Sequence, residues 1–80
     1  MHELALTREI VAIAREHAGG RRVARVKVSI GALAAVVPDS VSFCFDACVK
    51  GSELEGARLE LIAVDGADVR VVELELEPRV

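Results

Sequence analysis

The sequence has very few aromatic residues, with two Phe and no Trp or Tyr among 80 residues. It also lacks a basic excess, since 10 Lys and Arg face 13 Asp and Glu for a formal net charge of -3. Nucleic acids are bound by cationic surfaces, and single strands also by stacking on aromatic rings. We therefore expect no nucleic-acid partner.

Long hydrophobic runs are missing as well. No apolar stretch approaches the roughly 20 residues that a membrane-spanning helix needs, and the first 30 residues show no basic region followed by a long apolar segment. We therefore expect no membrane association and a cytoplasmic location.

Cysteine is scarce, with only Cys44 and Cys48 in the chain. In a helix these two residues lie one turn apart on one face, where disulfide geometry is difficult to satisfy. We expect free thiols in a reducing compartment.

Catalytic motifs are absent from the sequence. It contains no serine beside a plausible base, no glycine-rich phosphate loop, and only two histidines. We therefore expect a binding protein and not an enzyme.

Aliphatic residues dominate the 52% hydrophobic content, which predicts one folded domain with an economical core. Helical spacing predicts a helix over residues 4–17, ended by Gly19 and Gly20. Its expected core residues are Leu6, Ile10, Ile13 and Ala14. His17 lies near the helix end, where a cation interacts favourably with the helix dipole, so we expect a structural role for it.

The next segment alternates with period two, which predicts a half-buried strand over residues 22–30. Its two faces would carry Ala24, Val26, Val28 and Ile30 on one side and Arg25, Lys27 and Ser29 on the other. A second helix should follow Pro38, capped by Asp39 or Ser40 and ended by Gly51. Its core-facing stripe would be Val41, Cys44, Phe45 and Cys48.

Two further strands are predicted over residues 57–64 and 69–77, joined by the tight turn "DGAD" at 65–68. The order α-β-α-β-β predicts an α+β two-layer sandwich, with two helices on one face of a three-stranded sheet. We expect the last two strands to form an antiparallel hairpin. Arg25 and Lys27 would pair with the acidic residues of the last strand, which favours the C-terminal strand in the middle of the sheet.

The first residues, "MHE", place several nitrogen atoms close together. The Met1 α-amine, the His2 imidazole, and the backbone amides of His2 and Glu3 can form five- and six-membered chelate rings. A planar, nitrogen-rich site of this kind selects Ni(II) or Cu(II). The alternative interpretation is a frayed terminus with an incidental histidine.

Three separated segments carry a family resemblance: "MHELALTREIVAIAREHAGG", "VKVSIGALAAVVPDSVSFCFD" and "GSELEGARLEL". In order and spacing they resemble the HypA/HybF family of nickel-insertion proteins for NiFe hydrogenase maturation. The resemblance implies a nickel metallochaperone whose Ni(II) site is carried by Met1, His2 and Glu3. It also implies a HypB-type GTPase and the hydrogenase large subunit as partners, and it leaves a homodimer open.

The chain departs from this family at one place. Members normally carry a zinc-binding lobe with two CxxC pairs where this sequence has only "DGAD". We therefore predict a single nickel-binding domain over residues 1–80, with a short turn at 65–68 in place of the zinc lobe and no zinc. Asp39 is either a helix cap or a group near the metal.

Two other functions stay open at this point. The chain could be a protein-interaction or oligomerisation module without metal, or an engineered scaffold from which the zinc lobe was deleted.

Overall fold

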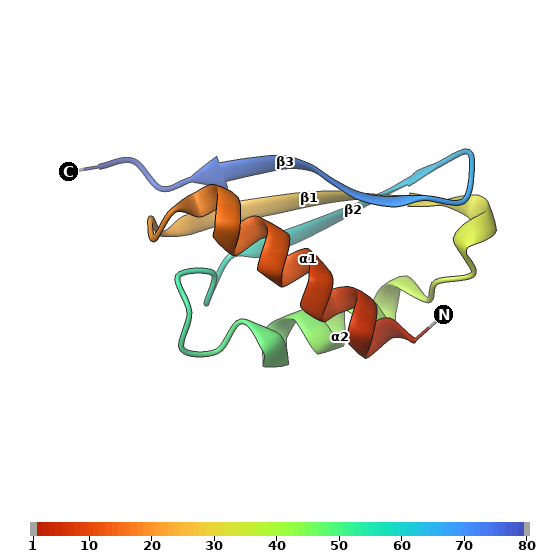
Figure 1. Cartoon of the computed structure of the whole chain (residues 1–80), viewed down its shortest axis with the longest axis horizontal. Coiled ribbons are helices and arrows are strands. Elements are labelled where there is room, and N and C mark those ends of the chain that lie inside the picture. Colours follow the sequence, from red (N-terminus) through yellow and green to blue (C-terminus); the bar gives the residue numbers. More distant parts are fainter. Residues whose placement is uncertain (1, 80) are drawn as a thin grey trace.

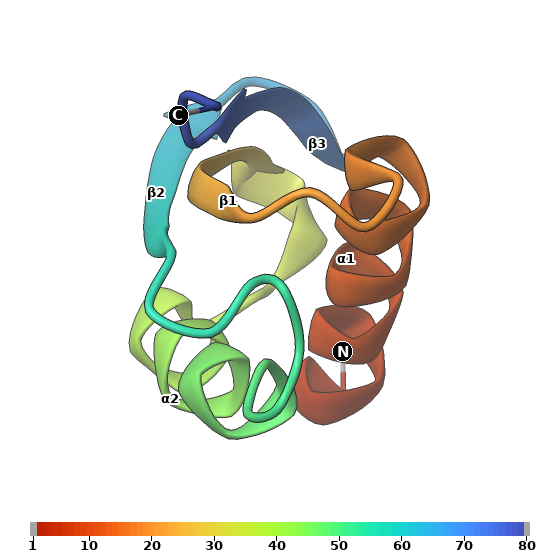
Figure 2. The same cartoon turned by 90° about the vertical axis from the view of Figure 1, so that its left-hand side faces the viewer.

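The computed structural model describes residues 2–79. Its elements are α1 (Glu3–Ala18), β1 (Val23–Gly31), a short 3-10 helix η1 (Ala32–Ala34), α2 (Pro38–Cys48), β2 (Arg58–Val64) and β3 (Val69–Leu76). Both helices lie on one side of the three strands (Figures 1 and 2). The predicted two-layer α+β sandwich and its order of elements are confirmed.

The strand order is β2-β1-β3, so the first strand is central. It pairs in parallel with β2, through a crossover that contains α2, and antiparallel with β3. The last two strands do run antiparallel to each other, as predicted. However, the expectation that they pair as a hairpin is wrong, as is the expectation that the C-terminal strand is central, because β1 lies between them (Figure 2).

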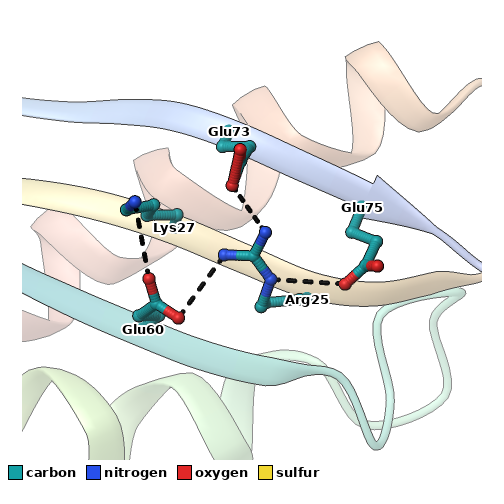
Figure 3. Close-up of polar contacts among 5 residues, drawn as sticks. All are labelled: Arg25, Lys27, Glu60, Glu73 and Glu75. Carbon is teal, nitrogen blue, oxygen red and sulfur yellow. Dashed lines mark hydrogen bonds and ion pairs between the residues drawn. The ribbon is translucent and has the colours of Figure 1, made fainter.

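A network of ion pairs on the outer face of the sheet is consistent with this order. The Arg25 guanidinium lies 3.4 Å from Glu60 on β2, and on β3 it lies 2.5 Å from Glu73 and 3.3 Å from Glu75 (Figure 3). Lys27 also reaches Glu60, at 3.6 Å. Glu60 thus adds an acidic partner on β2 to the carboxylates of the last strand. In the central position, the basic residues of β1 lie next to acidic residues on both neighbouring strands.

The connection at 65–68 crosses the end of β1. Gly31 donates its backbone N–H to the Asp68 carbonyl at 2.8 Å, and Leu33 donates to the Gly66 carbonyl at the same distance. A Cβ atom on residue 31 would lie only 2.4 Å from the Gly66 carbonyl oxygen. Glycine at position 31 therefore permits a four-residue segment to join two strands that are not neighbours.

The core lies between the sheet and the two helices and is almost entirely aliphatic. Its least exposed members are Ala14, Val26, Val28, Val41, Phe45 and Leu54. Leu54 belongs to the loop after α2, which is held beside the sheet by a hydrogen bond from the Val23 N–H to the Glu53 carbonyl. Through Leu54, this loop thus covers part of the core that α1 and α2 do not cover.

Two residues of the predicted core, Ile13 and Ala24, are wrong. Ile13 is 43% exposed, and α1 buries Thr7 and Val11 instead. Val23 is buried in place of Ala24, because the pairing of β1 with β3 is irregular between Val23 and Arg25 and shifts the alternation.

The ion pair between Arg25 and Glu73 should make the stability of the fold depend on pH. Its hydrogen bond lowers the pKa of Glu73 from the ordinary value of 4.5, so this carboxylate stabilises the fold above that pH. The contribution disappears as the pH falls through the lowered pKa. We expect Arg25→Met to melt at a lower temperature than the unchanged protein at pH 7, with the difference shrinking as the pH falls from 5 to 3.

Melting curves at half-unit pH intervals measure this effect. Lys50→Met, at an exposed position outside the network, is the control and should follow the unchanged protein throughout. Parallel curves for Arg25→Met and the unchanged protein would contradict the role assigned to Arg25.

Candidate metal centre

His2 is the N-cap residue of α1 and directly precedes its first helical residue, Glu3. Its backbone is extended, with φ -90° and ψ 103°, its side chain is exposed, and its carbonyl accepts the first helical hydrogen bond from the Leu6 N–H at 3.1 Å. The first N–H groups of a helix have no acceptor within the helix. The backbone nitrogens of His2 and Glu3 are therefore not committed to α1. Met1, the third residue of the predicted site, lies outside the described residues.

Glu3 is half-buried in the first turn and is held at two points. Its carbonyl accepts a hydrogen bond from the Thr7 hydroxyl at 2.7 Å, and its carboxylate accepts one from the Val37 N–H at 3.3 Å. Thr7 is wholly buried, so the first bond also satisfies a polar group in the core. Sequence reasoning missed both partners, although a threonine inside a helix often bonds the carbonyl four residues earlier.

The start of α2 lies beside the start of α1 (Figure 1), where the Val37 N–H meets the Glu3 carboxylate. The expectation that Asp39 or Ser40 caps the helix is wrong, because Pro38 takes the first helical position and moves the cap to Val37. Asp39 instead lies exposed in the first turn, where its negative charge interacts favourably with the helix dipole.

His17 lies at the opposite end of α1, roughly 20 Å from His2 at the usual rise of a helix. The predicted end of the helix is confirmed, since Gly19 adopts a left-handed conformation and its N–H bonds the Arg15 carbonyl at 3.2 Å. The structure therefore does not bring the two histidines together.

The two cysteines are free, as predicted. They are less buried than the predicted core stripe implied, because Val41 and Phe45 fill the interior of α2 while Cys44 and Cys48 are half-exposed. Cys48 packs against the core and lines a small hollow with Leu4, Arg8 and Val11.

Within residues 2–79 no three His, Cys, Asp or Glu side chains gather in an arrangement that could hold a metal ion. Over the same residues, no helix is both long enough and apolar enough to cross a membrane.

Comparison with known proteins identifies the family. Residues 1–74 match the family model described as "Hydrogenase/urease nickel incorporation, metallochaperone, hypA". The chain belongs to the HypA family. The HypA hydrogenase maturation factor of Nostoc punctiforme is 52% identical over 82% of this chain and 58% of its own length. The corresponding protein of Geobacter sp. strain M21 is 54% identical over 82% of this chain and 60% of its own length.

The chain thus spans about three fifths of the length of these HypA relatives. Its fold matches the solution structure of the nickel metallochaperone HypA from Helicobacter pylori, with a TM-score of 0.82 over 95% of this chain and 97% of that one, at 18% identity. A second HypA solution structure matches with a TM-score of 0.69 over 96% and 97% of the two chains, at 20% identity. The HypA description names nickel incorporation for urease as well as hydrogenase, which is broader than the sequence resemblance implied.

The position of the cysteines leads to a prediction about zinc. Structural zinc sites need about four Cys or His ligands, and two thiols on one helix face cannot supply them. We expect the purified protein to contain less than one tenth of an equivalent of zinc, and its melting temperature to be unchanged by EDTA. Elemental analysis and melting curves measure both. One zinc per chain, or unfolding by the chelator, would contradict the prediction.

Proposed function

We propose that this chain carries Ni(II) at its N-terminal segment, bound by the Met1 α-amine, the His2 imidazole and backbone nitrogen atoms of His2 and Glu3. The observation that supports this most directly is the exposed His2 at the N-cap of α1, where the backbone nitrogens of His2 and Glu3 have no acceptor within the helix. Binding there leaves the helix and its packing intact.

The chemistry of this donor set favours nickel. Coordination by a backbone amide requires that amide to lose its proton, which Ni(II) and Cu(II) promote and Zn(II) generally does not. The resulting planar geometry suits these two metals. A site of this kind selects Ni(II) over Zn(II) by its planar geometry and by deprotonation of backbone amides. It therefore does not need to be enclosed by side-chain ligands.

The biological role follows from the family. HypA proteins are described as nickel-incorporation metallochaperones, so the proposed task is delivery of Ni(II) to a hydrogenase or urease precursor. The proposed partners are a HypB-type GTPase and the hydrogenase large subunit, in the cytoplasm. In this proposal residues 65–68 stand where the family's zinc lobe is inserted, so any step that depends on that lobe is absent.

Replacing His2 tests the site. His2→Ala should lower nickel affinity at least about tenfold, equivalent to ~1.4 kcal/mol, because one ligand is lost. The free energy of unfolding should change by no more than about 0.5 kcal/mol, since the side chain is exposed and caps nothing. Calorimetric titration with Ni(II) and melting curves measure the two quantities.

His17→Ala is the matched control, because His17 is also an exposed histidine on α1 but lies at the other end. It should bind nickel as the unchanged protein does. Equal nickel affinity in both variants would overturn the assignment of His2.

The amine is tested separately in a chain that begins at Met1. Its nickel complex should be yellow and diamagnetic, with a visible absorption band that indicates planar coordination by deprotonated amides. Enzymatic acetylation of the Met1 amine, which leaves His2 intact, should abolish the band. A band that persists after complete acetylation, checked by mass spectrometry, would indicate a site built from side chains alone.

A further inference from the structure

The Glu3 carboxylate caps a helix to which it does not belong. Val37 is the N-cap of α2, its own side chain cannot accept a hydrogen bond, and its N–H donates to Glu3 Oε2 at 3.3 Å. In a capping box this bond comes from a glutamate three residues after the cap. In α2 that position is Ser40, so Glu3 supplies the missing acceptor from α1.

Charge favours the same arrangement. A carboxylate is stabilised at the N-terminus of a helix, and α2 is long enough, at 11 residues, to have a substantial dipole. Glu3 is thus bound to α2 by its side chain and to Thr7 by its carbonyl. These two bonds fix the backbone directly after His2.

We propose that Glu3 is a positioning residue for nickel, whose carboxylate acts on the Val37 N–H and not as a metal ligand. This inference rests on the proposed function. Holding Glu3 in place restricts the backbone nitrogens of the N-terminal segment to few conformations. Apparent affinity rises with the fraction of molecules already in the binding conformation.

Four variants separate positioning from ligation. Glu3→Gln keeps an oxygen that accepts from Val37 but is a poor nickel ligand, whereas Glu3→Ala removes the acceptor. Val37→Pro removes the donor without altering the metal segment, and φ at Val37 is -90°, within about 25° of the proline value. Val37→Ala keeps the donor and controls for the lost side chain, which is exposed.

We expect Glu3→Ala and Val37→Pro each to weaken nickel binding about tenfold, as does the loss of a residue that holds a metal ligand in place. Glu3→Gln and Val37→Ala should stay within about twofold of the unchanged protein, because the hydrogen bond survives. The double variant Glu3→Ala/Val37→Pro should be no weaker than either single variant, because both remove the same bond.

The contradicting outcomes are distinct. Equal loss of affinity in Glu3→Gln and Glu3→Ala, with normal binding by Val37→Pro, would make the carboxylate a ligand and overturn the proposal. Additive losses in the double variant, or altered melting with unaltered nickel affinity, would also overturn it.

Failure of the proposed function would be recognised differently. In that case His2→Ala would bind nickel as tightly as the unchanged protein. The hydrogen bond between Glu3 and Val37 could then still be tested by melting temperature. The double variant Glu3→Ala/Val37→Pro should melt no lower than the less stable single variant, because both changes remove the same bond.

Discussion

Strand β1 is the element on which the other parts of the domain depend. Its inner face contributes Val26 and Val28, both completely buried, to the packing against the helices. Both its edges form hydrogen bonds, and Arg25 on its outer face binds acidic residues of both neighbours. An 80-residue chain buries little apolar surface. Its stability therefore benefits from a central strand that combines hydrogen bonds on both edges, apolar packing on one face and ion pairs on the other.

The central position of β1 also decides how the N-terminal segment is presented. Because β1 and β2 are parallel, the chain must return through η1 and α2 across one face of the sheet. This return places the start of α2 beside the start of α1, where the Glu3 carboxylate meets the Val37 N–H. A residue at the beginning of the sequence is thereby held by a residue more than 30 positions later.

The proposed metal site differs in kind from a structural one. A structural zinc site joins distant parts of a chain, so its removal unfolds the protein. Here the buried core consists almost entirely of apolar side chains, and His2 lies exposed outside it. A protein that must give up its metal to a precursor benefits from this separation, since neither binding nor release requires the core to change.

The sequence alone was sufficient for the order of helices and strands and for the family. The helical periodicity of α1, the left-handed glycine that ends it and the burial of Val26 and Val28 on one face of β1 follow from short-range rules of backbone geometry. The motif "MHE" and the spacing of three separated segments predicted the HypA family, and the match over residues 1–74 confirmed it. The assignment of nickel to Met1, His2 and Glu3 stays a prediction.

Only the tertiary structure decided the strand order, the cap of α2 and the partners of Glu3. Alternating polarity shows which face of a strand is buried but not which strand lies at its edge, and Arg25 pairs with acidic residues on both neighbouring strands, Glu60 and Glu73. Likewise, Asp39 and Ser40 are good capping residues by type, yet the acceptor for Val37 came from another helix. Contacts between residues far apart in sequence depend on how whole elements pack, and no local pattern records that packing.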